Sequence, residues 1–188
     1  IHLSVKSSAF LAIEAAKKAT QNQDLSQLAL IIVATMTPEN NTPSNACLVQ
    51  KALGLNHQSM MCFDINVACS GYVYALKVAQ SLLEENQYGL VIGSEQLSSI
   101  VDYQDRNTCI LFGDGAAAAV VEYAPDALYT SHLGADGTGA KYLYAHSALP
   151  RSPFVKAKRE MELGDPDMRL APQAWEYTML QDGKEVYR

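Results

Sequence analysis

Charged side chains are scarce in this 188-residue sequence. Lysine, arginine, aspartate and glutamate make up 18% of it, whereas hydrophobic residues make up 48%. Typical soluble domains carry about 25% charged residues. A chain with so little charge must bury much of its surface, either in a sheet covered on both faces or in a subunit interface. The composition also excludes a disordered chain, because disorder requires low hydrophobicity and high net charge.

Long apolar runs and an excess of positive charge are lacking as well. The longest purely apolar run, Leu28–Ala34, is far shorter than the ~20 residues that span a membrane. The formal net charge is −6, from 14 basic and 20 acidic residues, which argues against general binding to nucleic acid or an anionic membrane. We therefore expect neither partner. Because the first residue is Ile1 rather than methionine, we expect the natural start to lie upstream.

The four cysteines lack the spacing of a metal site. Cys47, Cys62, Cys69 and Cys109 include no Cys-x-x-Cys pair, so we expect no metal. A disulfide framework is also unexpected in a chain of this size without an export signal. Free thiols in a cytoplasmic protein are the default, and the question is whether one of them is special.

Hydrophobic patterns alternate between helix and strand through the first half of the chain. We expect helices at residues 4–20, 43–53 and 69–85, and strands at residues 28–34, 61–67, 90–92, 116–123 and 128–133. The alternation predicts an α/β fold with a mixed sheet covered by helices. Pro43 is expected at the first helical position of the second helix, and Gly54 ends it. The third helix is apolar nearly all round, which favours a central position.

The segment from Asn66 to Tyr72 is the most informative one for chemistry. A strand ends there and a helix begins within two or three residues, so that Cys69 stands on the connecting turn, as in a nucleophile elbow. The helix N-terminus would favour the reactive thiolate there. The alternative is that Cys69 is a small buried hydrophobic residue, as most free cysteines are. Cys47 in a helix, and Cys62 and Cys109 in strand-like runs, fit that alternative better.

Three other segments can be explained without a catalytic role. Gly113-Asp114-Gly115 lacks the lysine and the third glycine of phosphate-binding motifs, and indicates a tight turn into a strand packed closely by another element. Arg106 is either a solvated arginine paired with a nearby aspartate or a functional residue. His132 and His146 are expected to be structural.

Several motifs together resemble the β-ketoacyl-acyl-carrier-protein synthase III family. They are Ala68-Cys69-Ser70-Gly71, Asp105-Arg106-Asn107-Thr108, Phe112-Gly113-Asp114-Gly115-Ala116, His132-Leu133-Gly134-Ala135-Asp136-Gly137, Thr42-Pro43-Ser44-Asn45-Ala46-Cys47 and Asp182-Gly183-Lys184-Glu185-Val186. The resemblance implies a thiolase-like fold with αβαβα layers, of which residues 1–188 form the N-terminal half only. Residues 151–173 match no family motif and are expected to form an exposed excursion.

The resemblance also implies a function. In the family, the cysteine takes an acyl group from acyl-CoA, which is a substrate, and no further cofactor is implied. The acyl-enzyme then condenses with malonyl-acyl-carrier protein, losing carbon dioxide, to initiate fatty-acid synthesis. Cys69 matches the nucleophile, with its backbone N–H as an oxyanion donor. The family's histidine and asparagine, which assist decarboxylation, belong to the second half, so we expect the 188-residue chain by itself to lack full activity.

The resemblance further implies substrate-binding residues and a partner subunit. Arg106 matches an adenine-contacting arginine at the mouth of the acyl-CoA tunnel, and Thr42 matches a residue that reaches the acyl pocket of the partner in a homodimer. Other pocket-lining positions are matched by Met36, Leu97, Phe112 and Leu143. The dimer contact is expected near residues 61–67.

Two other function classes remain open. One is a related acyltransferase or polyketide-type condensing enzyme that uses the same cysteine. The other is a non-catalytic half-domain or scaffold partner, although a scaffold has no need of a thiol at position 69.

Overall fold

The computed structural model describes residues 6–145 and 179–186, which fall into two compact units. Unit 1 takes its described residues from 6–97 and 113–133, and unit 2 takes them from 98–112, 134–145 and 179–186. The expected excursion at 151–173 and His146 lie outside the described residues.

Unit 1 is built around a four-stranded sheet with the strand order β2-β1-β3-β4. The strands are β1 (Leu28–Ala34), β2 (Met61–Ile65), β3 (Tyr88–Gln96) and β4 (Asp114–Glu122). β1 pairs in parallel with β2 and β3, with Ile31 opposite both Cys62 and Leu90, and β4 pairs antiparallel to β3. The expected mixed sheet is therefore confirmed.

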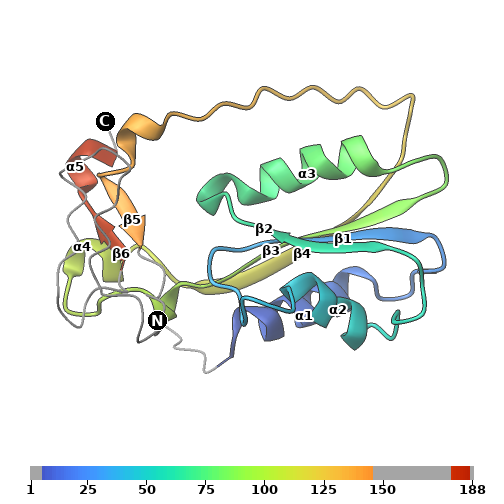
Figure 1. Ribbon diagram of the computed structural model, residues 1–188, viewed down its shortest axis with the longest axis horizontal. Coiled ribbons are helices and arrows are strands. Elements are labelled where there is room, and N and C mark those ends of the chain that lie inside the picture. The colour runs from blue at the N-terminus through green and yellow to red at the C-terminus, as the bar shows by residue number, and fades with distance from the viewer. Residues whose placement is uncertain (1–5, 146–178, 187–188) are drawn as a thin grey trace, which may run out of the picture. The chain divides into compact units, whose positions relative to one another are not determined.

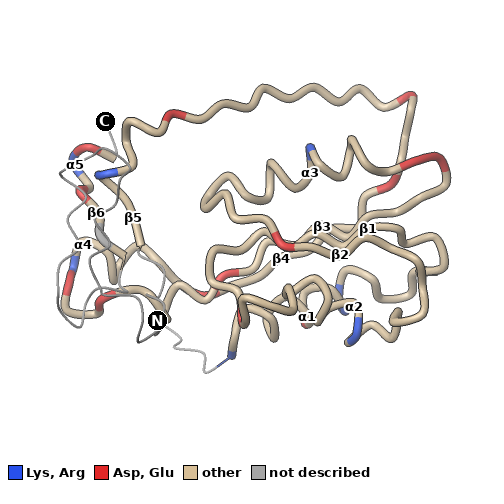
Figure 2. Tube along the Cα trace, viewed as in Figure 1, with Lys and Arg blue, Asp and Glu red and all other residues tan. Residues whose placement is uncertain are grey.

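Helices cover both faces of this sheet (Figure 1). α1 (Ser8–Ala19) and α2 (Asn45–Ala52) lie on one face, and α3 (Gly71–Leu82) lies on the other. β1 has no charged residue (Figure 2), and its side chains alternate between the two buried clusters on either side of the sheet. Ile31 and Val33 pack toward α1 and α2, whereas Leu30 and Ile32 pack toward α3. A strand covered on both faces needs such a continuous apolar sequence.

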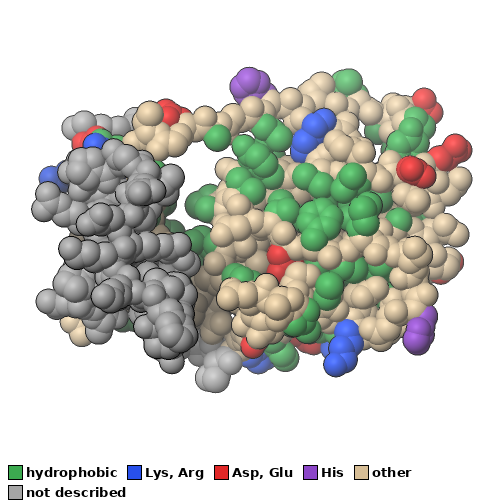
Figure 3. Space-filling model, in the orientation of Figure 1, with side chains coloured by type: hydrophobic (Ala, Val, Ile, Leu, Met, Phe, Trp, Pro, Cys, Tyr) green, Lys and Arg blue, Asp and Glu red, His purple; other side chains and the backbone are tan. Residues whose placement is uncertain are grey.

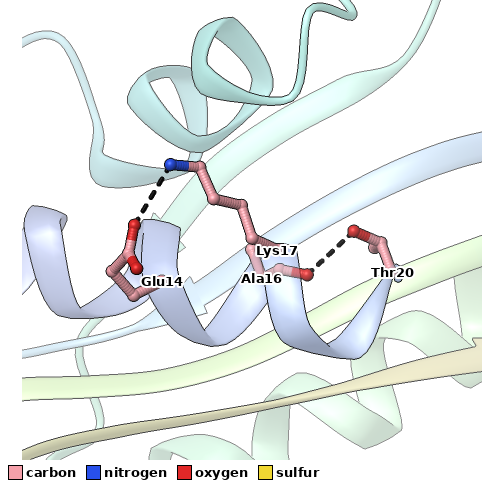
Figure 4. Close-up of polar contacts among 4 residues, drawn as sticks. All are labelled: Glu14, Ala16, Lys17 and Thr20. Atoms are coloured by element: carbon pink, nitrogen blue, oxygen red, sulfur yellow. Dashed lines mark hydrogen bonds and ion pairs between the residues drawn. The ribbon is translucent and has the colours of Figure 1, made fainter. Parts of the chain in front are cut away.

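Helix α1 shows how local sequence sets the ends of an element. The Ser7 hydroxyl caps its N-terminus by accepting from the Phe10 N–H at 3.3 Å. At the other end, the Thr20 hydroxyl donates to the Ala16 carbonyl at 2.9 Å (Figure 4). Lys17 and Glu14 form an exposed ion pair at 3.1 Å. Such a pair adds only about 0.2–0.5 kcal/mol, so packing of the alanine-rich face holds the helix in place.

Unit 2 contains short elements. They are η2 (Leu97–Ser99, which begins on the last residue of unit 1), α4 (Arg106–Cys109), η3 (Gly137–Gly139), β5 (Leu143–Ala145), β6 (Met179–Gln181) and α5 (Gly183–Val186). β5 and β6 form an antiparallel pair that the sequence patterns did not indicate. The Met179 N–H donates to the Ile100 carbonyl at 2.6 Å, which joins β6 to the segment before α4.

Several expected elements differ from those observed. Residues 128–133 form no strand, because no neighbouring strand pairs with them among the described residues, and Leu128 is 96% exposed. α2 begins at Asn45 rather than at Pro43, because the Ser44 side chain caps it by accepting from the Cys47 N–H. Cys109 ends a short helix rather than lying in a strand.

The prediction of a central third helix is wrong for the chain as described. α3 buries the face that carries Ala75 and Ala79, but Val73 is 50% exposed and Leu82 is 38% exposed. Hydrophobic side chains gather on the face of unit 1 that Figure 3 shows. The apolar sequence of α3 therefore exceeds what the described residues cover. No helix among the described residues is long and apolar enough to cross a membrane.

Candidate active site

Cys69 lies on the expected turn between a strand and a helix. β2 ends at Ile65, the 3-10 turn η1 (Ala68–Ser70) follows, and α3 begins at Gly71. Ala68 has a φ of 42°, in the left-handed region that costs a non-glycine residue roughly 1–2 kcal/mol. Backbone strain of this kind is typical of sharp turns at functional sites. Cys69 is the exposed one of the four cysteines, so the turn presents its thiol to solvent.

Close packing holds this turn against the sheet. A Cβ atom at Gly71 would lie 3.0 Å from the Cβ of Ala34, so the start of α3 presses directly on the end of β1. A Cβ at Gly93 would contact the Tyr72 ring at 3.6 Å, which brings α3 close to β3 as well. The carboxyl ends of parallel strands in α/β sheets are where binding sites form. The thiol therefore stands at the edge of the sheet where a substrate can approach.

The turn leaves a hydrogen-bond donor beside the thiol. The Ser70 and Gly71 N–H groups close η1 by donating to the carbonyls of Val67 and Ala68. The described residues supply no acceptor for the N–H of Cys69 itself. Cys69 lies two residues before the 12-residue helix α3, at its positive end, where negative charge is stabilised. An oxyanion formed on a group bonded to the sulfur would find a donor there.

The loop after β1 is fixed by a carboxylate from β3. Glu95 accepts from the Met36 N–H at 2.8 Å and from the hydroxyls of Thr37 at 2.6 Å and Thr35 at 3.3 Å. Thr37 in turn accepts from the Gln96 N–H at 2.8 Å. These bonds bring Met36 beside the end of β3. Leu97 is the residue that follows this strand. Two of the predicted pocket segments are therefore held together.

A second carboxylate, Asp64 on β2, caps α2. It accepts from the N–H groups of Asn45 at 2.7 Å and Ala46 at 2.9 Å. Burial raises the pKa of the Asp64 carboxyl above its ordinary value, and the two backbone hydrogen bonds oppose part of that rise. Asp64 also lines an open cleft of about 290 Å³ at the carboxyl ends of β1 and β2, together with Thr35, Ser44 and Asn66.

The remaining predicted site residues have varied surroundings. In unit 1, Met36 and Leu97 are half-buried, and Thr42 is exposed on the loop before α2, where the Thr42–Pro43 peptide is cis. In unit 2, Arg106 is exposed, Phe112 is half-buried and Leu143 is 36% exposed. Whether these residues bind substrate stays a prediction.

The segment around Arg106 is organised by Asp105. The Asp105 carboxylate accepts from the Asn107 N–H at 2.9 Å and from the Thr108 hydroxyl at 3.1 Å, which caps α4. At Gly113 and Gly115, by contrast, a Cβ would meet no atom within 4 Å. These two glycines are therefore not points of close approach, but the strand that begins between them is packed as expected, since Ala118 of β4 contacts the cluster that contains Ala12 and Ala16 of α1.

Sequence reasoning missed Glu95, Asp64 and the strained backbone of Ala68. The two carboxylates were visible in the sequence, because Asp64 interrupts the apolar pattern of β2 and Glu95 lies at the polar end of the otherwise apolar β3. A buried carboxylate requires hydrogen-bond donors, but the strand pattern does not tell where they come from.

Comparison with known proteins gives a consistent result. Residues 63–137, which include Cys69 and Arg106, match the family model described as 3-Oxoacyl-[acyl-carrier-protein (ACP)] synthase III. The chain is 44% identical over 184 residues to the beta-ketoacyl-[acyl-carrier-protein] synthase III of Caldanaerobacter subterraneus subsp. tengcongensis, covering 95% of this chain and 51% of that one. The chain thus spans about half the length of the curated relatives it matches.

Solved structures agree with the sequence matches. The beta-ketoacyl-[acyl-carrier-protein] synthase III of Thermus thermophilus superposes with a TM-score of 0.78 at 33% identity, covering 100% of this chain and 54% of that one. The priming beta-ketosynthase of the R1128 polyketide pathway superposes with a TM-score of 0.70 at 27% identity, covering 97% and 51%. The expected partial thiolase-like fold is confirmed.

Proposed function

We propose that this chain, which belongs to the β-ketoacyl-[acyl-carrier-protein] synthase III family, uses Cys69 to accept an acyl group from acyl-CoA and pass it to malonyl-acyl-carrier protein. The observation that carries the proposal is the exposed Cys69 on the strained turn between β2 and α3, inside the segment that matches the family. This would be the reaction that initiates fatty-acid synthesis.

The proposed chemistry proceeds in two steps through a thioester. The Cys69 thiolate attacks the acyl-CoA carbonyl, the Cys69 N–H stabilises the oxyanion, and CoA leaves as its thiol after taking a proton. The malonyl thioester then loses carbon dioxide, and its carbanion attacks the acyl group and releases Cys69. A covalent intermediate divides one difficult step into two easier ones. The residues described here account for the first step.

The proposal includes binding residues and a partner subunit. Arg106 would contact the nucleotide part of acyl-CoA, because a guanidinium both stacks on a base and pairs with phosphate. Met36, Thr42, Leu97, Phe112 and Leu143 would line the acyl pocket. β2 is an edge strand of its sheet among the described residues and Met61 on it is 45% exposed, which supports a homodimer formed through this strand.

We also propose that the reaction needs no further cofactor and takes place in the cytoplasm. The acyl transfer needs the thiol and acyl-CoA as substrate, without another cofactor. We place the protein in the cytoplasm, since four free cysteines suit a reducing compartment.

A labelled acyl-transfer experiment tests the proposed function. The purified chain is incubated with acetyl-CoA that carries a radioactive acetyl group, then denatured and digested, and the label is mapped. We expect a thioester on Cys69 that hydroxylamine removes. The Cys69→Ala variant should take no label, while Cys109→Ala should label normally. A folded chain that remains unlabelled would favour the non-catalytic alternative.

A polyketide-type condensing role is the second candidate. The similarity to the R1128 priming beta-ketosynthase favours it, although the identity there is 27% against 44% for the beta-ketoacyl-[acyl-carrier-protein] synthase III relative. Both candidates share the acylation of Cys69. The relative affinity of the acylated chain for malonyl-loaded carrier proteins of each type would separate them.

A further inference from the structure

We propose that Cys47 and Cys62 form a reactive thiol pair that hydrogen peroxide oxidises to a reversible disulfide between helix α2 and strand β2. This site is separate from Cys69 and does not depend on the acyl-transfer proposal.

The two cysteines are in contact across the packing of α2 on the sheet. The thiol of Cys47 points at the backbone carbonyl of Cys62, with 3.9 Å between sulfur and oxygen. Cys62 also packs against the buried cluster that contains Ala46 and Val49 of α2. Both thiols are half-buried, so a small oxidant can reach them while bulkier reagents are hindered.

Neighbouring contacts hold this pair in place. Asp64 follows Cys62 by two residues and therefore points to the same face of β2. Its carboxylate binds the Asn45 and Ala46 N–H groups at 2.7 and 2.9 Å, which fixes the first turn of α2 over β2. On the other side, the Ser44 hydroxyl donates to the Cys47 sulfur at 3.3 Å. Cys47 is thus anchored beside Cys62 rather than sampling many positions.

The surroundings of Cys62 suppress its ionisation. Burial, with a smaller contribution from the neighbouring Cys47, raises the pKa of Cys62 to about 11. Cys62 therefore stays protonated at neutral pH, and because only a thiolate is nucleophilic we assign it the resolving role and leave the first attack to Cys47. An asymmetric pair of this type suits a two-step oxidation with one attacking and one resolving sulfur.

The reaction balances with one peroxide per pair. The Cys47 thiolate attacks one peroxide oxygen and breaks the O–O bond, giving a Cys47 sulfenic acid and hydroxide, which takes a proton to become water. The Cys62 sulfur then attacks the Cys47 sulfur, forming the S–S bond. The departing hydroxyl leaves as water with the Cys62 proton. Two electrons pass from the two sulfurs to the peroxide.

The pair lies on the opposite face of the sheet from α3. Phe63 and Ile65 of β2 pack with the cluster that contains Ala75 and Ala79 of α3, whereas Cys62 packs with the cluster under α2. Oxidation of the pair should therefore leave the Cys69 thiol available. A chain that forms no Cys47–Cys62 disulfide can therefore still be tested for acylation of Cys69, and the two proposals can fail independently.

Peptide mapping tests the proposal directly. The folded 188-residue chain is treated with hydrogen peroxide, its remaining thiols are blocked, and it is digested with trypsin and an Asp-specific endoproteinase. Cleavage after Lys51 separates Cys47 from Cys62, and cleavage before Asp64 separates Cys62 from Cys69. We expect one dominant cross-linked product, joining the Cys47 and Cys62 peptides, that a thiol reductant splits.

A thiol count and matched variants complete the test. In Cys69→Ser, which keeps three thiols, oxidation should remove two and leave Cys109 free. Cys62→Ala should lose the cross-link, while Cys109→Ala should keep it. The proposal is overturned if folded wild-type chain yields no such peptide when its thiols are consumed, or if the cross-link forms equally in the chain unfolded in urea.

Discussion

The Cβ of Ala34 would lie 3.0 Å from a Cβ placed at Gly71, so α3 can begin against the end of β1 only because residue 71 has no side chain. Gly71→Ala should move the turn that carries Cys69 and destabilise the fold by about 1–3 kcal/mol, the usual cost of overpacking. Urea unfolding measures this. Gly115→Ala is the control, because a Cβ at Gly115 meets no atom within 4 Å, and its effect should stay within about 0.5 kcal/mol.

Cys69 should react first with iodoacetamide at neutral pH. It is the exposed cysteine, whereas Cys47, Cys62 and Cys109 are half-buried. Mapped alkylation over time, with the folded and the urea-unfolded chain in parallel, checks this order. Unfolding should equalise the four rates, and Cys69→Ser should remove the fast phase. Equal labelling of all four cysteines in the folded chain would contradict the prediction.

Arg106→Ala should weaken acyl-CoA binding by about tenfold or more, since hydrogen bonds to charged groups contribute about 1.5–3 kcal/mol. Titration calorimetry measures the affinity. Lys51→Ala, which removes another exposed positive charge, should leave the affinity unchanged. The Cys69 alkylation rate should remain the same in Arg106→Ala, because the variant removes a binding contact and not the thiol. An unaltered affinity would refute this role of Arg106.

Glu95→Gln should loosen the loop that carries Met36. The carboxylate accepts three hydrogen bonds from residues 35–37, and the amide cannot accept all of them. We expect a loss of about 1–2 kcal/mol in the free energy of unfolding. Hydrogen exchange of the Met36 amide should become faster. The exposed Glu122 serves as the control, since Glu122→Gln should change neither quantity. Unchanged exchange at Met36 would show that Glu95 does not hold the loop.

Asp64 should give the chain a pH-dependent stability of definite sign. Its pKa is raised by burial above the ordinary value of 3.8, so folding favours the protonated form. The contribution is fully present below pH 3.8 and is lost as the pH rises through the raised pKa. Relative to Asp64→Asn, the wild type should therefore become less stable between pH 3.8 and neutrality, as urea unfolding at several pH values would show.

Asp24→Asn should change the pH dependence of stability in the opposite direction to Asp64→Asn. The pKa of this exposed carboxyl is lowered by hydrogen bonds from the backbone N–H and the hydroxyl of Ser26. Any contribution from Asp24 should thus appear above its ordinary pKa and be lost on acidification. Identical pH profiles for the two variants would contradict the assignment of burial as the cause at Asp64.

The sequence by itself determined the order of the main elements and the site at Cys69. α1, β1, α2, β2 and α3 follow from hydrophobic periodicity and from end signals such as Gly54, whose φ of 75° suits a helix stop. The turn at Cys69 follows from a strand pattern that meets a helix pattern across small residues. These are local properties, because a few neighbouring side chains settle each of them.

Only the tertiary structure decided which distant groups meet. Glu95 binds the Thr37 hydroxyl from 58 residues away, and Asp64 caps a helix that begins 19 residues before it. Residues 128–133 have a strand-like pattern but gain no strand, because a strand exists only where a neighbour supplies its hydrogen bonds. Cys47 and Cys62 likewise become a pair only when α2 packs on β2. Sheet pairing and burial depend on the whole chain, and the local sequence of a segment does not determine which distant residues it contacts.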